Sequence, residues 1–279
     1  MDSTMVSFLA APFAASLILT GIHAYLGVHV IERGVIFVDL SLAQFAVLGA
    51  TLALMLQAGA GHGHTSLVYW MSLGFTFVGA AVFATVRTRK SRIPQEAIIG
   101  ICYAVASAAS ILLMSKAPSE SEHLKDMLVG NILAVSWEKV FLTAGLYAAI
   151  GAFHFVFRRK FLAISIDHER AEDTGLNVRF WDFLFYASFG FVVTSSVSIA
   201  GVLLVFCYLI VPSVAAMLYS EHIGTRLAIG WTMGTIVSAV GVYLSLILDF
   251  PTGAMIVCTF GVALAIMALV RPLIVRAAR

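Results

Sequence analysis

Long apolar runs follow one another along almost the whole chain, separated by short polar segments. A helix needs about 20 apolar residues to cross the hydrocarbon core of a bilayer, which is about 30 Å thick. One run, residues 180–218, is too long for one crossing and too short for two with a full loop, so we expect a tight turn at 196–201. The pattern predicts an all-α polytopic membrane protein, a bundle of about nine transmembrane helices over residues 6–28, 34–57, 66–86, 93–114, 140–157, both halves of 180–218, 227–248 and 253–270.

Composition supports this interpretation. Of the 279 residues, 61% are hydrophobic and 11% are charged, whereas soluble domains have about a quarter charged residues. This excludes a soluble globule, a disordered chain and a disulfide-stapled secreted module. We predict one membrane domain over residues 1–279, with the first apolar run retained as a helix because it is long for a signal peptide and lacks a basic leader.

Other compositional features add little. The net charge of +2 gives no indication of nucleic acid binding. Three cysteines lie far apart in apolar runs without a CxxC spacing, which is typical of small core residues rather than of a zinc or redox site; they are Cys102, Cys207 and Cys258.

Basic residues predict the orientation of the helices. Of the 17 Lys and Arg residues, 14 follow the odd-numbered predicted helices, and only Lys116, Lys125 and Lys139 fall on the other side. Because cytoplasmic segments carry the excess of Lys and Arg, we expect the N-terminus outside and the C-terminus in the cytoplasm, in the plasma (inner) membrane.

The inner segment 161–182 contains a predicted short helix. Asp167 can cap its N-terminus, Glu169 lies in its first turn, and Gly175 can end it. Two interpretations stay open: a capped connector between membrane helices, or a docking element for a cytoplasmic partner.

Several motifs carry a resemblance to a known family. Asp167, Glu169, Ala171 and Gly175 match the form F-D-x-E-x-A-x-x-x-G, with Ile166 in place of the Phe. Further matching segments are 99–101 after Glu96, 129–133, 201–204, 211–216 and 244–254. In this order and spacing, over essentially its whole length, the chain resembles the metal-type ABC transporter permeases, the zinc, manganese and iron uptake family.

The resemblance implies a permease that works with other proteins. These are a cytoplasmic ATP-binding subunit, an extracytoplasmic metal-binding protein and a second permease copy, and the helix 167–175 would be the cytoplasmic coupling helix that docks on the ATPase. The chain has no Walker A loop, GxGxxG, HExxH or GxSxG motif. We therefore expect a transport subunit rather than an enzyme, with no cofactor of its own and a divalent metal ion as the transported species.

Two alternatives remain at this stage. One is a cation channel or secondary carrier that needs no ATPase. The other is an ABC permease for a chelated metal.

Ionisable residues inside the membrane are costly and are candidates for function. We interpret single histidines near helix ends as structural, two acids near the inner ends of helices as reaching headgroups or water, and an acid at an outer turn as a backbone cap. These residues are, in that order, His23 and His154, Glu96 and Asp182, and Asp249.

Asp39 differs because it is expected several residues inside the second helix, near Ser41 and Gln44. In the resembling family this helix often carries D-A-L-S-H, whose Asp and His are metal ligands, which makes Asp39 and Gln44 the candidate metal residues of the translocation path. Here Gln44 replaces the imidazole and Asp39 lies one residue early, so the two point roughly 140° apart on a regular helix. Either the helix widens between them, or Asp39 works with other helices and Gln44 binds no metal; the alternative is a polar cluster that only packs helices.

The outer loops offer a second metal hypothesis. His62 and His64 flank a glycine, and His123 lies among acids. Imidazole and carboxylate suit zinc or manganese, but a plain solvated loop explains the same residues.

Overall fold

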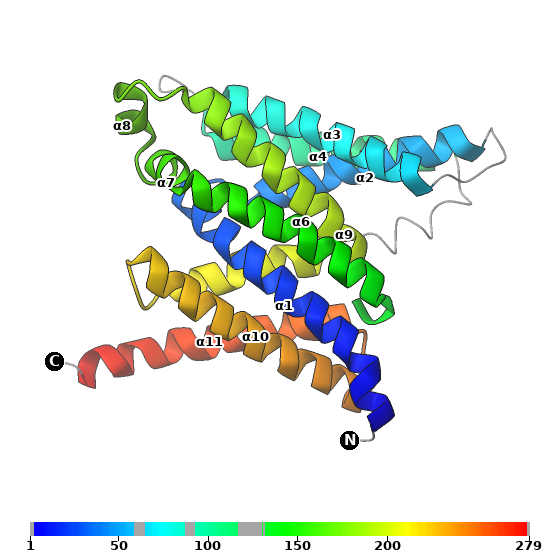
Figure 1. Cartoon of the computed structure of the whole chain (residues 1–279), viewed down its shortest axis with the longest axis vertical. Coiled ribbons are helices and arrows are strands. Elements are labelled where there is room, and N and C mark those ends of the chain that lie inside the picture. The colour runs from blue at the N-terminus through cyan, green and yellow to red at the C-terminus, as the bar shows by residue number, and fades with distance from the viewer. Residues whose placement is uncertain (1–2, 59–64, 87–92, 117–129, 131, 278–279) are drawn as a thin grey trace. The chain divides into compact units, whose positions relative to one another are not determined.

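The computed structural model describes residues 3–58, 65–86, 93–116, 130 and 132–277, and these ranges form helices and contain no strand (Figure 1). The predicted all-α fold is confirmed. The long helices are α1 (Ser3–Glu32), α2 (Val38–Ala58), α3 (Thr65–Val86), α4 (Gln95–Met114), α6 (Trp137–Val156), α9 (Val178–Met217), α10 (Ile223–Leu248) and α11 (Thr252–Ala277). The short elements are a 3₁₀ turn, η2 (Ile132–Ala134), and two short helices, α7 (Arg158–Ile166) and α8 (His168–Asp173).

Eight helices in the described part of the chain are long and apolar enough to cross a membrane. They coincide with the predicted runs, with ends moved by a few residues. α1 continues to Glu32 rather than to residue 28, and α2 begins at Val38 rather than at 34. The chain is therefore a multi-pass membrane protein.

α9 accounts for the difference between eight helices and about nine predicted crossings. Its 40 residues correspond to about 60 Å at 1.5 Å per residue, about twice the hydrocarbon thickness. The helix breaks only at Gly201, where φ is 75° and ψ is 162°. The tight turn expected over 196–201 is wrong in extent, because the residues before Gly201 stay helical and the Ser196 hydroxyl donates to the Val192 carbonyl at 2.6 Å.

The chain divides into two compact units, each described by itself. Unit 1 comprises Met1–Ile31, Val129–Gly151 and Ile199–Arg279, and unit 2 comprises Glu32–Leu128 and Ala152–Ser198. Small residues allow helices to approach closely within each unit, as is common in membranes. A Cβ on Gly27 would lie 2.0 Å from the Leu209 carbonyl oxygen in unit 1, and one on Gly49 would lie 2.4 Å from that of Met71 in unit 2.

Large apolar side chains are exposed along α4 and α11. The exposed fraction reaches 69% at Leu112 and 74% at Leu269. Exposed apolar side chains of this kind suit a bilayer or an apolar partner surface rather than water.

Candidate functional site

The segment 161–182 forms the short helix that the sequence predicts. α8 begins after Asp167, whose carboxylate accepts a hydrogen bond from the Arg170 backbone N–H at 3.0 Å. Glu169 lies in the first turn, where the positive end of the helix dipole favours an acid. Ala171 is buried, while Ile166, which stands where the family has Phe, is exposed.

Gly175 ends α8 as predicted. Its φ is 81°, a conformation that glycine adopts without steric cost. Its N–H donates to the Glu172 carbonyl at 2.9 Å, and the next N–H, of Leu176, donates to that of Ala171 at 3.3 Å. These two bonds form a Schellman motif, so both ends of the helix are defined by its own residues.

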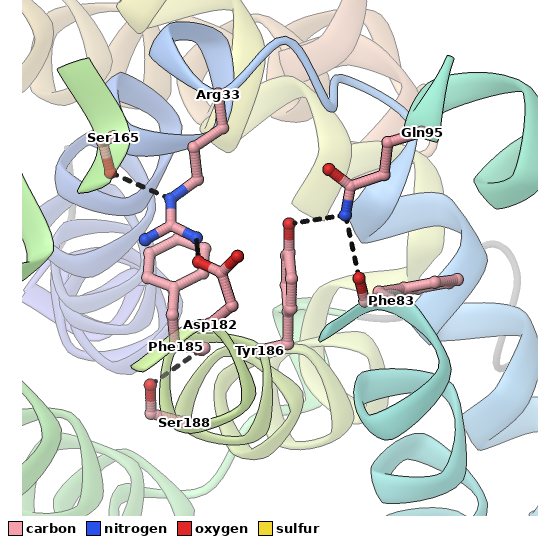
Figure 2. Close-up of polar contacts among 8 residues, drawn as sticks. All are labelled: Arg33, Phe83, Gln95, Ser165, Asp182, Phe185, Tyr186 and Ser188. Carbon is pink, nitrogen blue, oxygen red and sulfur yellow. Dashed lines mark hydrogen bonds and ion pairs between the residues drawn. The ribbon is translucent and has the colours of Figure 1, made fainter. Parts of the chain in front are cut away.

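A buried polar cluster in unit 2 joins residues from three separate parts of the chain (Figure 2). Arg33 follows the end of α1, and its side chain has no exposed surface. The guanidinium donates through Nε to Ser165 of α7 at 2.9 Å and through Nη1 to Asp182 of α9. Its central carbon lies 3.9 Å from the centre of the Phe185 ring. Arg33 therefore ties the segment between α1 and α2 to both α7 and α9.

The Arg33–Asp182 ion pair contradicts the prediction for Asp182 and shows a role for Arg33 that the sequence did not predict. Asp182 was expected to reach headgroups or water, but it is fully buried against Arg33. The sequence indicates Arg33 only as one of the 14 basic residues predicted on the cytoplasmic side. The sequence contains one indication of the pair: Asp182 is predicted at the same depth as Arg33, and a buried charge needs an opposite charge.

His154 of α6 belongs to the same unit and is also fully buried. Its ring stacks on Phe161 with 4.3 Å between ring centres, and its Nε2 lies 2.8 Å from the Ser188 hydroxyl. This is the structural role predicted for it.

A side chain of α4 bonds to the backbone at the start of α2. Glu96 is half-buried and accepts a hydrogen bond from the Phe37 backbone N–H at 2.9 Å through one carboxylate oxygen. Gln95 beside it donates to the Phe83 carbonyl at 3.0 Å and to the Tyr186 hydroxyl at 3.1 Å (Figure 2).

Asp39 lies in the first turn of α2 rather than several residues inside the helix, because the helix begins only at Val38. The side chain is fully buried, and neither carboxylate oxygen has a hydrogen-bond partner in the described part of the chain. The Ser41 hydroxyl, two residues later in the same turn, is likewise buried without a partner there. A carboxylate in this state calls for a proton or a cation.

Gln44 and Asp39 do not lie on the same face of α2. α2 is α-helical from Val38 to Ala58, so the local widening that would bring the two side chains together is absent from it. The two residues therefore stay on different faces of the helix. This removes the widening alternative. A metal role for Asp39 without Gln44 stays a prediction, beside a polar cluster that only packs helices.

The described part of the chain holds no group of three or more His, Cys, Asp and Glu side chains that could bind a metal ion. The histidines of the second metal hypothesis, His62, His64 and His123, lie outside the described residues. In the turn after α10, Asp249 is the left-handed C-cap, and its backbone N–H donates to the Ser245 carbonyl. The Ser245 hydroxyl donates to the Phe250 carbonyl at 2.7 Å.

Comparison with known proteins supplies a family. The family model described as "ABC 3 transport family" matches residues 5–271. The manganese transport system membrane protein MntC of Listeria innocua is 31% identical over 199 residues, which cover 69% of this chain and 70% of that protein. The chelated iron transport system membrane protein YfeC of Yersinia pestis is 28% identical over 183 residues, which cover 66% of this chain and 62% of that protein.

A solved structure shares the fold. A chain of PsaBC from Streptococcus pneumoniae in complex with Fab superposes with a TM-score of 0.76 at 25% identity, covering 93% of this chain and 90% of that one.

Proposed function

The chain belongs to the ABC 3 transport family, and we propose on that premise that it is the membrane-spanning permease of an importer for divalent transition metal ions. A separate cytoplasmic subunit hydrolyses the ATP. The observation that carries the proposal is the family match over residues 5–271, in a chain whose inner segment forms a helix capped at both ends. The single permease domain over 1–279 is part of the proposal.

The relatives guide the choice of metal. Their names specify manganese for MntC and chelated iron for YfeC. Manganese and iron are therefore the first ions to test, and zinc follows because carboxylate and imidazole ligands suit it equally. A permease for a chelated metal is the second candidate, favoured by the likeness to YfeC, and competition between free and chelated iron separates the two.

The proposed partners are an ATP-binding subunit inside, a metal-binding protein outside and a second permease copy. This arrangement requires the N-terminus outside, the C-terminus in the cytoplasm and α8 on the cytoplasmic side. A cysteine placed at Ser66 should then react with an impermeant maleimide in intact cells, and one placed at Glu172 should react only after lysis. The reverse labelling pattern would remove α8 from reach of the ATPase.

Coupling through α8 is tested in proteoliposomes that contain the permease and its co-expressed ATPase subunit. Gly175→Pro should uncouple hydrolysis from manganese uptake, because proline cannot adopt a φ of 81° and has no N–H for the Glu172 carbonyl. Glu169→Lys should weaken ATPase binding by reversing a charge in the first turn of α8. Glu221→Lys makes the same reversal on an exposed residue of another segment, between α9 and α10, and should change neither property.

Wild-type coupling and wild-type ATPase binding in both α8 variants would contradict the docking role. Manganese uptake that proceeds without the ATPase subunit would favour the rival function, a channel or secondary carrier.

A further inference from the structure

His23 lies in the middle of a membrane-spanning helix. The candidate span within α1 is Leu9–Glu32, so the sequence-based placement of this histidine near a helix end is wrong. Its side chain is fully buried. Nδ1 lies 2.8 Å from the Leu19 carbonyl oxygen, one turn earlier. Because a carbonyl can only accept, Nδ1 carries the ring proton and Nε2 presents its lone pair.

That lone pair has no hydrogen-bond partner among the described residues. The adjacent ring of Tyr147 meets the imidazole edge-on, with 6.3 Å between ring centres. His154 provides the comparison, because its Nε2 is 2.8 Å from a hydroxyl. A buried polar atom without a partner costs free energy, and the cost rises in a membrane where water is scarce.

A second unpaired polar atom lies on the same face of α1. The Thr20 hydroxyl is buried and has no partner among the described residues. Residues three apart in a helix face nearly the same way, so Thr20 and His23 present an oxygen and a nitrogen to one side. The Thr20 side chain packs against α10, where a Cβ on Gly234 would lie 2.4 Å from its methyl group. All of these residues belong to unit 1.

We propose that Nε2 of His23 is a ligand for the transported divalent metal ion, with the Thr20 hydroxyl and water completing the coordination. The inference rests on the proposed transport function. Metal-binding histidines typically donate their other ring N–H to a carbonyl or carboxylate, which fixes the tautomer and ring orientation, and the Leu19 carbonyl does this for His23. Imidazole nitrogen suits zinc and iron, and the oxygen ligands that would complete the site suit manganese.

One imidazole and one hydroxyl make a weak site, and that suits passage rather than storage. An ion on a conduction path must bind well enough to enter and weakly enough to leave. The absence of a group of three or more His, Cys, Asp and Glu side chains in the described ranges agrees with a transient site.

The test uses Mn²⁺ as the probe on the untagged full chain with its co-expressed ATPase subunit. His62→Gln and His64→Gln in all samples remove the paired outer imidazoles. Pulsed EPR at saturating Mn²⁺ should show coupling to an imidazole nitrogen in this background. His23→Gln should abolish that coupling and reduce ATP-dependent Mn²⁺ uptake at least tenfold. His154→Gln, the matched buried imidazole, should leave the nitrogen coupling unchanged.

Thr20→Val keeps the side-chain shape, and it should raise the KM for Mn²⁺ several-fold while retaining the nitrogen coupling. If His23→Gln does not fold, the spectrum of the background protein and the KM of Thr20→Val still decide the question. Absence of nitrogen coupling in the background protein, its persistence in His23→Gln, or an unchanged KM in Thr20→Val would overturn the inference. If the background protein shows no ATP-dependent uptake of manganese, iron or zinc, the proposed function itself fails.

Discussion

Unit 2 contains two buried acids with opposite surroundings. Asp182 and Asp39 both have no exposed surface. Asp182 forms an ion pair with Arg33, which also bonds to Ser165 and lies over Phe185. Asp39 has no hydrogen-bond partner for either oxygen in the described part of the chain.

The difference separates two uses of a buried charge. A paired acid is compensated within the fold, so its loss should be felt mainly as lost stability. An unpaired acid is uncompensated until a proton or a cation arrives, so its loss should be felt mainly as lost function. Substitution of each acid or of its partner tests this distinction.

Arg33→Met should give the largest effect. It leaves the Asp182 carboxylate buried without its cation, and breaking a buried pair in this way typically costs about 3–5 kcal/mol. The expected result is a large fall in the temperature at which detergent-solubilised protein leaves the monodisperse peak in size-exclusion chromatography.

The double variant Arg33→Met/Asp182→Leu supplies the control, because it removes both charges together. It should recover most of the lost stability. A single Arg33→Met variant as stable as the wild type would show that the ion pair does not hold unit 2 together.

Asp39→Asn should give the opposite profile. Removing an uncompensated buried charge should leave thermal stability equal or raised. ATP-dependent Mn²⁺ uptake should fall about tenfold or more, which corresponds to about 1.4 kcal/mol in activation free energy. Uptake and melting are measured on the same preparations, with Asp182→Asn as the matched acid-to-amide control that should lower stability.

Gln44→Ala tests whether Asp39 acts without Gln44. Gln44 lies on a different face of a regular helix from Asp39, so its loss should leave uptake near the wild-type level. A fall equal to that of Asp39→Asn would mean that the two side chains act together after all.

The sequence predicts most of the fold because long apolar runs and capping residues act locally. The positions of α2, α3 and α10, the Asp167 cap and the Gly175 stop all follow from residues within a few positions. Unpredicted features depend on distant residues. Arg33 and Asp182 are 149 residues apart in the chain, so their pairing has no local signal.

The predicted positions of Asp39 and His23 within their helices were wrong for a similar physical reason. The placement of Asp39 depended on where α2 begins, and apolar periodicity does not define a helix end in a membrane protein. His23 seemed close to a helix end because α1 was predicted too short by four residues at its C-terminal end, Glu32 against residue 28. Whether a buried polar atom finds a partner is a property of the packed unit, so no sequence pattern could separate His23 from His154.

Ser165→Ala should give a smaller loss of stability than Arg33→Met, and it tests how the contacts of Arg33 share the stabilisation of the cluster. The variant removes the acceptor 2.9 Å from the Arg33 Nε, but it leaves the ion pair with Asp182 and the contact with Phe185. A lost hydrogen bond to a charged group costs about 1.5–3 kcal/mol, and we expect the lower end because the guanidinium keeps its anion. Thermal melting of the wild type, Ser165→Ala, Arg33→Met and Ser165→Ala/Arg33→Met forms a double-mutant cycle that isolates the interaction energy between the two side chains. If Ser165 acts through Arg33, Ser165→Ala should cost almost nothing once Arg33 is methionine, since the hydroxyl then has no guanidinium to accept from. An equal cost in both backgrounds would assign the effect of Ser165 to the local packing of α7 and would restrict the stabilising role of Arg33 to α9.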